Sequence, residues 1–535
     1  MKDRVSLTDF LMYHKETHPI SFHMPGHKGR GTLYGIYGFG DFIKNVVGND
    51  ITEIPGADAL QQPRERIKDI MEGYAGLYGA KHTELLVNGS SAGLMASILG
   101  SVPRGGKLLM GRNSHRSVYG ALRLGGVDPV YIMPEIDDET GLQLGLDPDK
   151  IEAALIEDPD IKAVLVTSPN YYGVLSDIER IASIVHLHGR ILIVDQAHGA
   201  HLKFFDYLRS EDGLPHRAAE NCGADIVVDS THKTLLSFTG SAILNICTER
   251  PDVSRISELL RMLQTTSPSY LLMGSLDINQ QILRMDGYNL IKNWDADIKY
   301  FYEEAAQIAG LGLIDRIDLD ETKVSITMSA LGLSGPELAE ELEKRNIWVE
   351  LTHGDYVMLM TGIGNERGDY EDVLSALRDL SAHHGGRIQG VEPESLASKT
   401  ESAAQNASQN QAKNEAQAMA KNEAQAANKN ASQAVDKNAE LRTPSSDSAL
   451  IERLEQRKIP DTYEEVPLYS AEGRVLYESI IPYPPGTPIA CPGEVLSKSV
   501  ILYVRDQLVA QHVVLGVDEE GRVKVESDCV LFKEI

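Results

Sequence analysis

The chain has 535 residues, of which 42% are apolar and 24% charged. At roughly 100–200 residues per domain, this length predicts two to four domains with sizeable cores. The formal net charge of −27 disfavours a nucleic-acid partner, because the phosphates would be repelled. No apolar stretch approaches the ~18 residues that span a bilayer, and the N-terminus lacks a signal-peptide core. The four cysteines are scattered and have no metal-site spacing, which indicates free thiols in a reducing, cytoplasmic setting: Cys222, Cys247, Cys491 and Cys529.

Short apolar runs recur in the first half of the chain, and each ends in small or polar residues. They lie at 84–87, 107–110, 129–133, 163–166, 191–194 and 226–228. Helical patterns fall between several of them, for example at 94–99 and 178–186. Buried strands that alternate with helices predict an α/β fold with a mostly parallel sheet. In such sheets ligands bind beyond the carboxyl ends of the strands, so residues that follow the runs are the candidates for chemistry.

The pattern changes after residue 285. Longer helices and a few strands, at 323–328, 348–351 and 356–360, predict a smaller α+β domain. A tract rich in Ala, Asn, Gln and Lys then buries too little apolar surface to fold, so we expect a disordered linker. The tail has a Pro-rich turn followed by strand-like runs at 499–504 and 522–532. We therefore divide the chain into an N-terminal segment with a large domain (1–285), a small domain (286–394), a linker (395–447) and a C-terminal α+β domain (448–535).

A Gly/Ser turn follows the first run. Residues 88–93 read NGSSAG and open a helical stretch. The free backbone N–H groups of such a helix start can hold a phosphate, with the hydroxyls of Ser90 and Ser91 as further donors. A plain N-cap is the alternative, and the spacing is neither a Walker motif nor a dinucleotide fingerprint.

Two charged residues end later runs. Asp195 closes a buried strand, where it can keep a cationic heterocyclic nitrogen protonated; capping of the next helix is the alternative. Lys233 follows the strand at 226–228, with Ser230 and His232 close by in sequence. Buried surroundings lower the pKa of a lysine and make its amine nucleophilic, whereas a salt-bridged structural lysine is the commoner case.

Together these features are the parts that pyridoxal 5'-phosphate needs: a phosphate grip, an acid for the pyridinium nitrogen and a Schiff-base lysine. Their order resembles that of the aspartate-aminotransferase-like, fold type I class of pyridoxal-phosphate enzymes. His115 follows another strand at the same rim and can stack on the open face of the ring. His23 and His27 are spaced like a helical metal pair, but the Pro and Gly between them disfavour that helix, so we expect no metal site.

The sequence resembles the bacterial ornithine/lysine/arginine decarboxylase family over nearly its whole length except the linker. The stretches that carry the resemblance are 23–29 (HMPGHKG), 50–54 with 56–58, 88–93, 112–117, 167–173 (TSPNYYG), 195–201 (DQAHGAH), 230–233 (STHK), 265–270 and, in the tail, 483–489 with 492–494. The resemblance implies decarboxylation of a basic amino acid, with Lys233 as the Schiff-base lysine, Asp195 as the pyridinium partner and His115 as the stacking residue. The side chains implied around the phosphate and the Schiff base are Ser90, Ser91, His198, Ser230 and His232. Either His232 or Lys233 then returns a proton to the substrate carbon.

Family members are dimers or assemblies of dimers with shared active sites. The resemblance therefore implies that Ser267 or Ser269 reaches the phosphate of the neighbouring subunit. It also implies that Glu494, in the tail, faces the distal cation of the substrate.

Three departures from the family pattern leave the substrate open. The usual DEAH is DQAH here, with Gln196, and the usual LDDLH is ADALQ, with Ala59 and Gln61. Both changes remove charge near the expected site. The chain also lacks the N-terminal wing domain of the large enterobacterial enzymes, so we expect a homodimer or a higher homo-oligomer without assuming their decamer.

Wing-less members are often biosynthetic arginine decarboxylases that feed polyamine synthesis, so we expect arginine first, then lysine and ornithine. The alternatives are transamination or other pyridoxal-phosphate chemistry on the same fold, and a non-enzymatic regulator that kept the fold.

Overall fold

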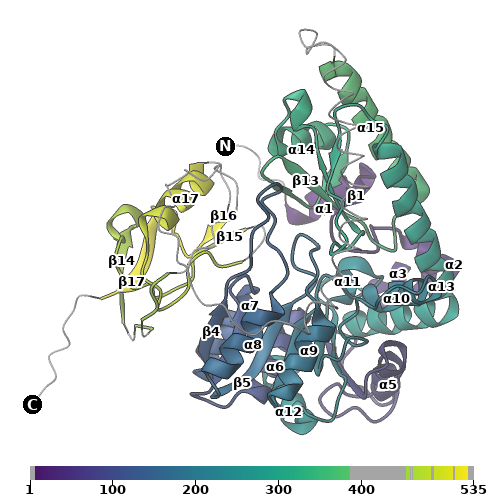
Figure 1. The fold of residues 1–535 in the computed structure, drawn as a ribbon. Coiled ribbons are helices and arrows are strands. Elements are labelled where there is room, and N and C mark those ends of the chain that lie inside the picture. The colour runs from purple at the N-terminus through teal and green to yellow at the C-terminus, as the bar shows by residue number, and fades with distance from the viewer. Residues whose placement is uncertain are drawn as a thin grey trace, which may run out of the picture.

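The computed structural model describes residues 6–385, 454–457, 459–460, 462–483, 487–509 and 513–527 (Figure 1). A large α/β part carries the main sheet, a smaller α+β part packs on it, and the C-terminal residues form a separate lobe beside α7 and β4 (Figure 1). The predicted linker at 395–447 and Cys529 lie outside the described residues.

The main sheet has seven strands in the order β2-β8-β7-β6-β5-β3-β4. Their bounds are β2 His82–Leu86, β3 Lys107–Gly111, β4 Asp128–Ile132, β5 Ile161–Thr167, β6 Ile191–Asp195, β7 Ile226–Asp229 and β8 Ala242–Ile246. Only β8 runs antiparallel to its neighbours, β7 and β2, which confirms the predicted mostly parallel sheet. The sequence reasoning located the other six strands and missed β8.

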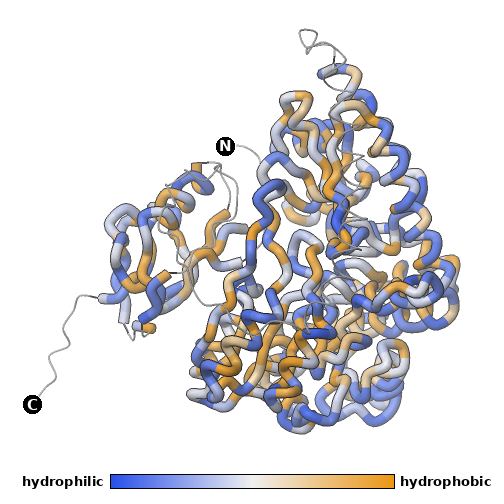
Figure 2. The backbone as a smooth tube through the Cα atoms, viewed as in Figure 1, coloured by the Kyte–Doolittle hydropathy of each residue, from blue (hydrophilic) through white to orange (hydrophobic). Residues whose placement is uncertain are grey.

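Helices cover both faces of this sheet, as its continuous apolar strands require. One face packs on α6 (Gly89–Ser101), α7 (Arg116–Gly125) and α12 (Val253–Leu263), and the other on α8 (Pro148–Glu157) and α9 (Ile178–Leu187). Figure 2 shows the apolar strands enclosed between these layers. A further apolar cluster holds α5 (Arg66–Tyr78), α10 (Leu202–Glu211) and α13 (Tyr270–Ala305). The backbone of α13 kinks at Asp286, which is where we placed the end of the large domain.

The small part is built on a four-stranded antiparallel sheet in the order β12-β13-β10-β9. Its elements are β9 Gly312–Leu313, β10 Lys323–Thr327, β12 Leu351–His353 and β13 Tyr356–Met360, with α14 (Gly335–Glu343), α15 (Arg367–Gly385) and the 3-10 turn η1 (Ser329–Leu331). The N-terminal strand β1 (Ile20–Phe22) pairs in parallel with β11 (Ile347–Val349). The start of the chain therefore packs with the small part, although the sequence analysis grouped it with the large domain.

Five short helices complete the first 385 residues. They are α1 (Leu7–Glu16), α2 (Gly31–Ile36), α3 (Gly40–Lys44), α4 (Val46–Asn49) and α11 (Thr231–Thr234). Within the described residues, no helix combines the length and the apolar character that crossing a membrane needs.

The described residues of the C-terminal lobe form two antiparallel strand pairs and one α-helix. In it β14 (Tyr463–Pro467) pairs with β17 (Arg522–Glu526), and β15 (Ile481–Tyr483) with β16 (Val513–Leu515); η2 (Leu468–Ser470) and α17 (Lys498–Val509) complete it. The strand predicted at 499–504 is wrong, because these residues lie in α17. Val500, Ile501 and Val504 are buried on one side of that helix, so the helical spacing of the run outweighs its β-branched composition.

Candidate active site

The carboxyl edge of the main sheet brings the predicted residues together. Asp195 is the last residue of β6, and Lys233 lies in the short helix α11 that follows β7. His115 is the N-cap of α7, directly after β3, and α6 begins after β2. Parallel strands end at one edge, so residues far apart in the sequence reach a common site.

The Lys233 amine lies in a buried, polar environment. Its Nζ atom is 2.9 Å from His198 Nε2. Burial lowers the pKa of Lys233, while the negative charges of Asp195 and Glu350 oppose that shift and the charge of Lys323 adds to it. A lysine whose neutral form is favoured is a nucleophilic amine, the form that attacks an aldehyde carbon.

Asp195 is only 3% exposed and faces the lysine. Burial raises its pKa, whereas Lys233 and the N–H of Ala197, which donates to Oδ1 at 3.2 Å, favour the carboxylate. The alternative role, capping of the next helix, does not apply, because α10 begins at Leu202 and has His201 as its N-cap. Asp195 is thus free to oppose a cation at the sheet edge.

His115 is held by the first turn of α7. Its Nδ1 accepts the N–H of Ser117 at 3.3 Å and lies 2.9 Å from the Ser117 hydroxyl. Burial, together with the charges of Lys233 and Arg116, lowers the pKa of His115 to about 4, so the ring is neutral near pH 7. A neutral, fixed imidazole suits stacking on a heterocycle.

The residues at this edge fit the phosphate of pyridoxal phosphate. Among the described residues, no side chain caps the N-terminus of α6, where Ser90 and Ser91 lie. The N–H of Gly89 donates to the carbonyl of Gly240 at 2.8 Å, so the uncapped N–H groups are those that follow it in the first turn. The buried Oγ of Ser230 has no hydrogen-bond partner among the described residues, and neither has Nδ1 of His198. Buried polar atoms are normally paired, and an anion would supply the missing acceptors here.

His232 points to a carbonyl rather than to the lysine. Its Nδ1 lies 2.6 Å from the carbonyl oxygen of Ser241 and must donate to it. Burial lowers the pKa of His232 to about 4. The neutral ring therefore has no proton on Nε2, which favours Lys233 over His232 as the group that returns a proton to a substrate carbon.

The sequence reasoning missed Glu350 and gave no role to Lys28. Glu350 Oε2 accepts the N–H of Met24 at 2.9 Å, and Oε1 accepts the Tyr171 hydroxyl at 3.3 Å. Lys28 Nζ donates to the carbonyls of His23 and Met360, at 2.6 and 2.9 Å. Burial lowers the pKa of Lys28 to about 7, and Glu350 opposes the shift. Two features of the sequence could have indicated these residues. Lys28 lies in the motif at 23–29, and Glu350 is an acid within the otherwise apolar run at 347–351.

The segment that carries Lys28 packs directly against the lysine turn. The N–H of Gly26 donates to the carbonyl of His232 at 2.8 Å, and a Cβ at position 26 would lie 2.3 Å from the carbonyl carbon of Thr234. Only glycine allows this approach, which explains the Gly in the motif. Behind the turn, the buried Lys323 donates to the carbonyl of His198 and to Asp320, both at 3.1 Å.

Gln196, one of the departures, faces away from the edge. Its Nε2 donates to Glu220 and to Asp229, at 3.0 Å each, and its Oε1 accepts the N–H of Ala219 at 2.8 Å. Burial and Glu220 raise the pKa of Asp229 well above its usual range. The expectation that this departure removes charge from the substrate site is therefore wrong, because the amide serves a buried acid pair.

The second departure lies on a partly exposed loop. Gln61 Nε2 donates to the carbonyl of Thr265 at 3.1 Å. Asp58, in the same stretch, accepts backbone N–H groups of residues 59, 64, 65 and 67, which holds the start of α5. Ala59 is half-buried beside it. Gln61 thus joins this loop to residue 265, next to the exposed Ser267.

Two expected binding residues have other partners. Ser269 is the N-cap of α13, and its hydroxyl oxygen accepts the N–H of Leu272 at 3.4 Å, which fixes the side chain while its O–H can still donate. Glu494 was expected to face the substrate, but it is 2% exposed and forms a bidentate pair with Arg112. Its carboxylate also accepts the N–H of Cys491 at 2.7 Å. The structure therefore corrects the substrate-binding prediction for Glu494, since the carboxylate is enclosed between two domains.

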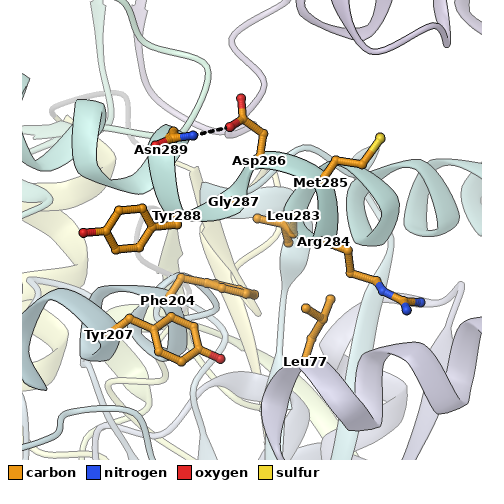
Figure 3. Close-up of a pocket in the computed structure, with 10 residues that line it drawn as sticks. All are labelled: Leu77, Phe204, Tyr207, Leu283, Arg284, Met285, Asp286, Gly287, Tyr288 and Asn289. Carbon is orange, nitrogen blue, oxygen red and sulfur yellow. Dashed lines mark hydrogen bonds between the residues drawn. The ribbon is translucent and has the colours of Figure 1, made fainter.

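A pocket of about 380 Å³ opens elsewhere, at the kink of α13 (Figure 3). Its lining residues are Leu77, Phe204, Tyr207, Leu283, Arg284, Met285, Asp286, Gly287, Tyr288 and Asn289. None of them belongs to the edge that carries Lys233, so this pocket is separate from the candidate active site.

The uncapped start of α6, the buried Asp195 and the part-buried Lys233 lie at one sheet edge and are the groups that a phosphorylated aldehyde cofactor needs. The chain belongs to the Orn/Lys/Arg decarboxylase family: the model of the family's major domain matches residues 5–311 and that of its C-terminal domain matches residues 444–516. The chain is 30% identical to an arginine decarboxylase of Bacillus anthracis, over 95% of this chain and 94% of the relative. An arginine decarboxylase of Bacillus subtilis is also 30% identical, over 95% and 94%.

Solved structures show the same fold. The constitutive lysine decarboxylase of Escherichia coli superposes with a TM-score of 0.66 at 20% identity, over 97% of this chain and 81% of that one. These comparisons confirm the predicted family, the predicted fold class and an amino-acid decarboxylase, and this family implies pyridoxal phosphate.

Proposed function

We propose that this protein is a pyridoxal-phosphate-dependent arginine decarboxylase that releases carbon dioxide and forms agmatine. The observation that carries the proposal is the part-buried Lys233, whose amine feels the charge of the buried Asp195, at one sheet edge with the uncapped start of α6. The similar proteins of two Bacillus species, which are named arginine decarboxylases, support arginine over lysine and ornithine. In a cytoplasmic setting the product would enter polyamine synthesis.

Different residues of the chain would bind different parts of the cofactor. Lys233 would bind the cofactor covalently, and Asp195 would keep its ring nitrogen protonated. Ser90, Ser91 and the unpartnered Oγ of Ser230 would hold the phosphate with the N–H groups of α6. The bound cofactor supplies an electron sink for the pair of electrons that the departing carboxylate leaves behind.

His115 would stack on the open face of the ring and keep the site closed to water on that side. His198, 2.9 Å from the Lys233 amine, holds that amine in place while the substrate amine enters. Lys233 would then deliver the proton to the substrate carbon from Nζ, because His232 donates its Nδ1 proton to Ser241 and has none on Nε2. These assignments follow from hydrogen-bond partners within the site.

The cationic end of the substrate needs an acid, and Glu350 is the carboxylate that the structure brings to the site in place of Glu494. The negative charge of Glu350 opposes the lowering of the pKa of Lys233, Lys28 and His23. Two hydrogen bonds, from Met24 and Tyr171, fix the carboxylate without neutralising it. We therefore assign Glu350 to the substrate guanidinium, for which a carboxylate is the complementary partner.

Replacement of Glu350 by Gln should raise KM for arginine roughly 10–100-fold with a smaller change in kcat, because a charged hydrogen bond contributes about 1.5–3 kcal/mol. Steady-state kinetics measure the split between the two constants. The matched control is Glu366→Gln, since Glu366 is an exposed carboxylate paired with Arg30 and should leave both constants unchanged. A fall in kcat at constant KM would contradict the assignment of Glu350 to substrate binding.

We also propose a homodimer with shared active sites. The first helix, α1, has no buried residue, and its apolar side chains Leu7, Leu11 and Met12 are 73%, 55% and 59% exposed. Val47, in α4, is 89% exposed. Such apolar surface favours a protein interface, and a second copy would cover it. Ser267 is exposed and does not cap α13. We therefore propose that Ser267 reaches the phosphate of the cofactor in the partner subunit.

The direct test offers arginine, lysine and ornithine separately to the cofactor-loaded protein and measures carbon dioxide release. We expect release from arginine at the highest kcat/KM, with one equivalent of agmatine formed. Formation of a keto acid without carbon dioxide would instead indicate an aminotransferase. A bound cofactor with no turnover of any of the three would indicate a regulator.

A further inference from the structure

The interface between the C-terminal lobe and the large domain is centred on a buried guanidinium. Arg112 follows β3, is 2% exposed, and uses all five of its N–H donors. Nε and one Nη donate to the two carboxylate oxygens of Glu494, at 3.2 and 2.8 Å. The remaining donors reach the carbonyls of Pro488 and Ile489, at 2.8 and 3.3 Å, and the Tyr119 hydroxyl at 3.0 Å.

The C-terminal side of this interface is equally closed. Residues 488–494 form the loop that supplies Glu494 and the two carbonyls, and the loop inserts Cys491 into an apolar cluster of the large domain. Cys491 is 1% exposed. A buried ion pair with every donor satisfied tolerates the loss of one partner poorly, because the other charge is left buried and unpaired.

Arg112 precedes His115 by three residues, and both lie in the turn between β3 and α7. The Tyr119 hydroxyl donates to the backbone carbonyl of Arg112 at 2.6 Å, and Tyr119 lies one helical turn beyond His115 in α7. The turn between β3 and α7 is thus fixed at its start by the C-terminal lobe and at its end by the helix. The backbone of Arg112, which this hydrogen bond ties to Tyr119, continues directly into the turn that carries His115.

We propose that Arg112 and Glu494 are positioning residues, through which docking of the C-terminal lobe fixes His115 against the cofactor. The residues proposed to hold the cofactor lie in the large domain, yet the cofactor site is complete only when the lobe is docked. The inference rests on the proposed function for the identity of the cofactor.

The test uses the full-length protein and two readouts besides activity. The first is the rate at which a thiol reagent labels Cys491, located by peptide mapping, which reports whether the lobe is docked. The second is the affinity for pyridoxal phosphate and the visible circular dichroism of the bound cofactor, measured without substrate. Glu494→Gln keeps the side-chain volume but replaces one carboxylate oxygen with an NH₂ group. That group would face the N–H donors of Arg112 and Cys491. We expect faster labelling of Cys491, a rise in the cofactor Kd of at least about tenfold and a weaker circular dichroism band.

The matched control is Arg123→Gln. Arg123 lies at the far end of α7, where its guanidinium is 4.7 Å from the ring of Tyr477 in the C-terminal lobe. This contact also joins α7 to the lobe, but it is distant in sequence from His115. We expect the control to match wild type within about twofold in cofactor Kd, since an exposed cation–π contact contributes little and lies away from the turn that carries His115.

If Glu494→Gln does not fold, Arg112→Lys tests the inference instead. This substitution keeps the positive charge but loses the five-donor geometry of the guanidinium. It should change both the labelling of Cys491 and the cofactor Kd in the same direction as Glu494→Gln. Faster labelling of Cys491 with an unchanged cofactor Kd and circular dichroism would overturn the inference while leaving the proposed function intact. Equal effects of the Glu494 and Arg123 variants would also overturn it. Wild-type protein that binds no pyridoxal phosphate would overturn both the inference and the proposed function.

Discussion

Lys233→Ala is expected to reduce decarboxylation at least about a thousandfold, the largest effect of any substitution at this site. In the proposed function the amine of Lys233 bonds to the cofactor and returns a proton to the substrate carbon, so the substitution should block both steps. The groups proposed to bind the phosphate, at Ser90, Ser91 and Ser230, remain, and the variant should still take up pyridoxal phosphate. Carbon dioxide release from arginine, together with absorbance of the bound cofactor after dialysis, measures the two properties separately.

Loss of a buried lysine can disturb a structure for reasons unrelated to chemistry. Lys203→Met is the matched control, because Lys203 is 8% exposed on α10 and donates to Asn221 away from the sheet edge. It should retain activity within a few-fold. Near-normal turnover by Lys233→Ala would remove the basis of the proposed function.

Asp195→Asn is expected to lower kcat about 100- to 1,000-fold while the protein still binds cofactor. The amide keeps the shape of the carboxylate and its hydrogen bond from Ala197, but it cannot hold a proton on a ring nitrogen. The variant also loses the charge that opposes the lowering of the pKa of Lys233, so the optical titration of the bound cofactor should move to lower pH.

The neighbouring buried acid supplies a sharp control for this substitution. Burial and the charge of Glu220 raise the pKa of Asp229 well above its usual range, which favours the neutral, protonated acid. Asp229→Asn is then close to isosteric and should leave kcat within a few-fold. If both Asn variants lost activity equally, the loss would reflect general damage at the strand ends rather than the charge of Asp195.

The cofactor side of the site could be predicted from sequence because its residues follow apolar strand runs in a fixed order. Asp195, Lys233 and His115 each stand directly after a run that the apolar pattern located, and parallel topology brings such residues together. The missed strand β8 had no effect on this inference, since it runs antiparallel and the residues that follow it do not lie at the same edge.

The substrate side could not be predicted in the same way. Glu350 and Lys28 come from segments more than 300 residues apart, and their proximity depends on pairing of β1 with β11. Glu494 was misjudged for a related reason: its partner, Arg112, lies 382 residues earlier in the chain, and no local pattern indicates that contact. For Gln196, the residue type could not reveal whether the side chain points toward the substrate or toward the buried residues behind the strand.

The pairing of β1 with β11 also has a consequence for biosynthesis. The segment that carries Lys28 leaves the ribosome first, but the strand Ile347–Val349, which pairs with β1, is made only about 320 residues later. The sheet edge that we propose binds the cofactor is encoded between residues 82 and 246, because β2 joins the sheet only through β8. Because contacts between distant segments form last, we expect a growing chain to form the proposed cofactor-binding edge before the proposed substrate-binding side.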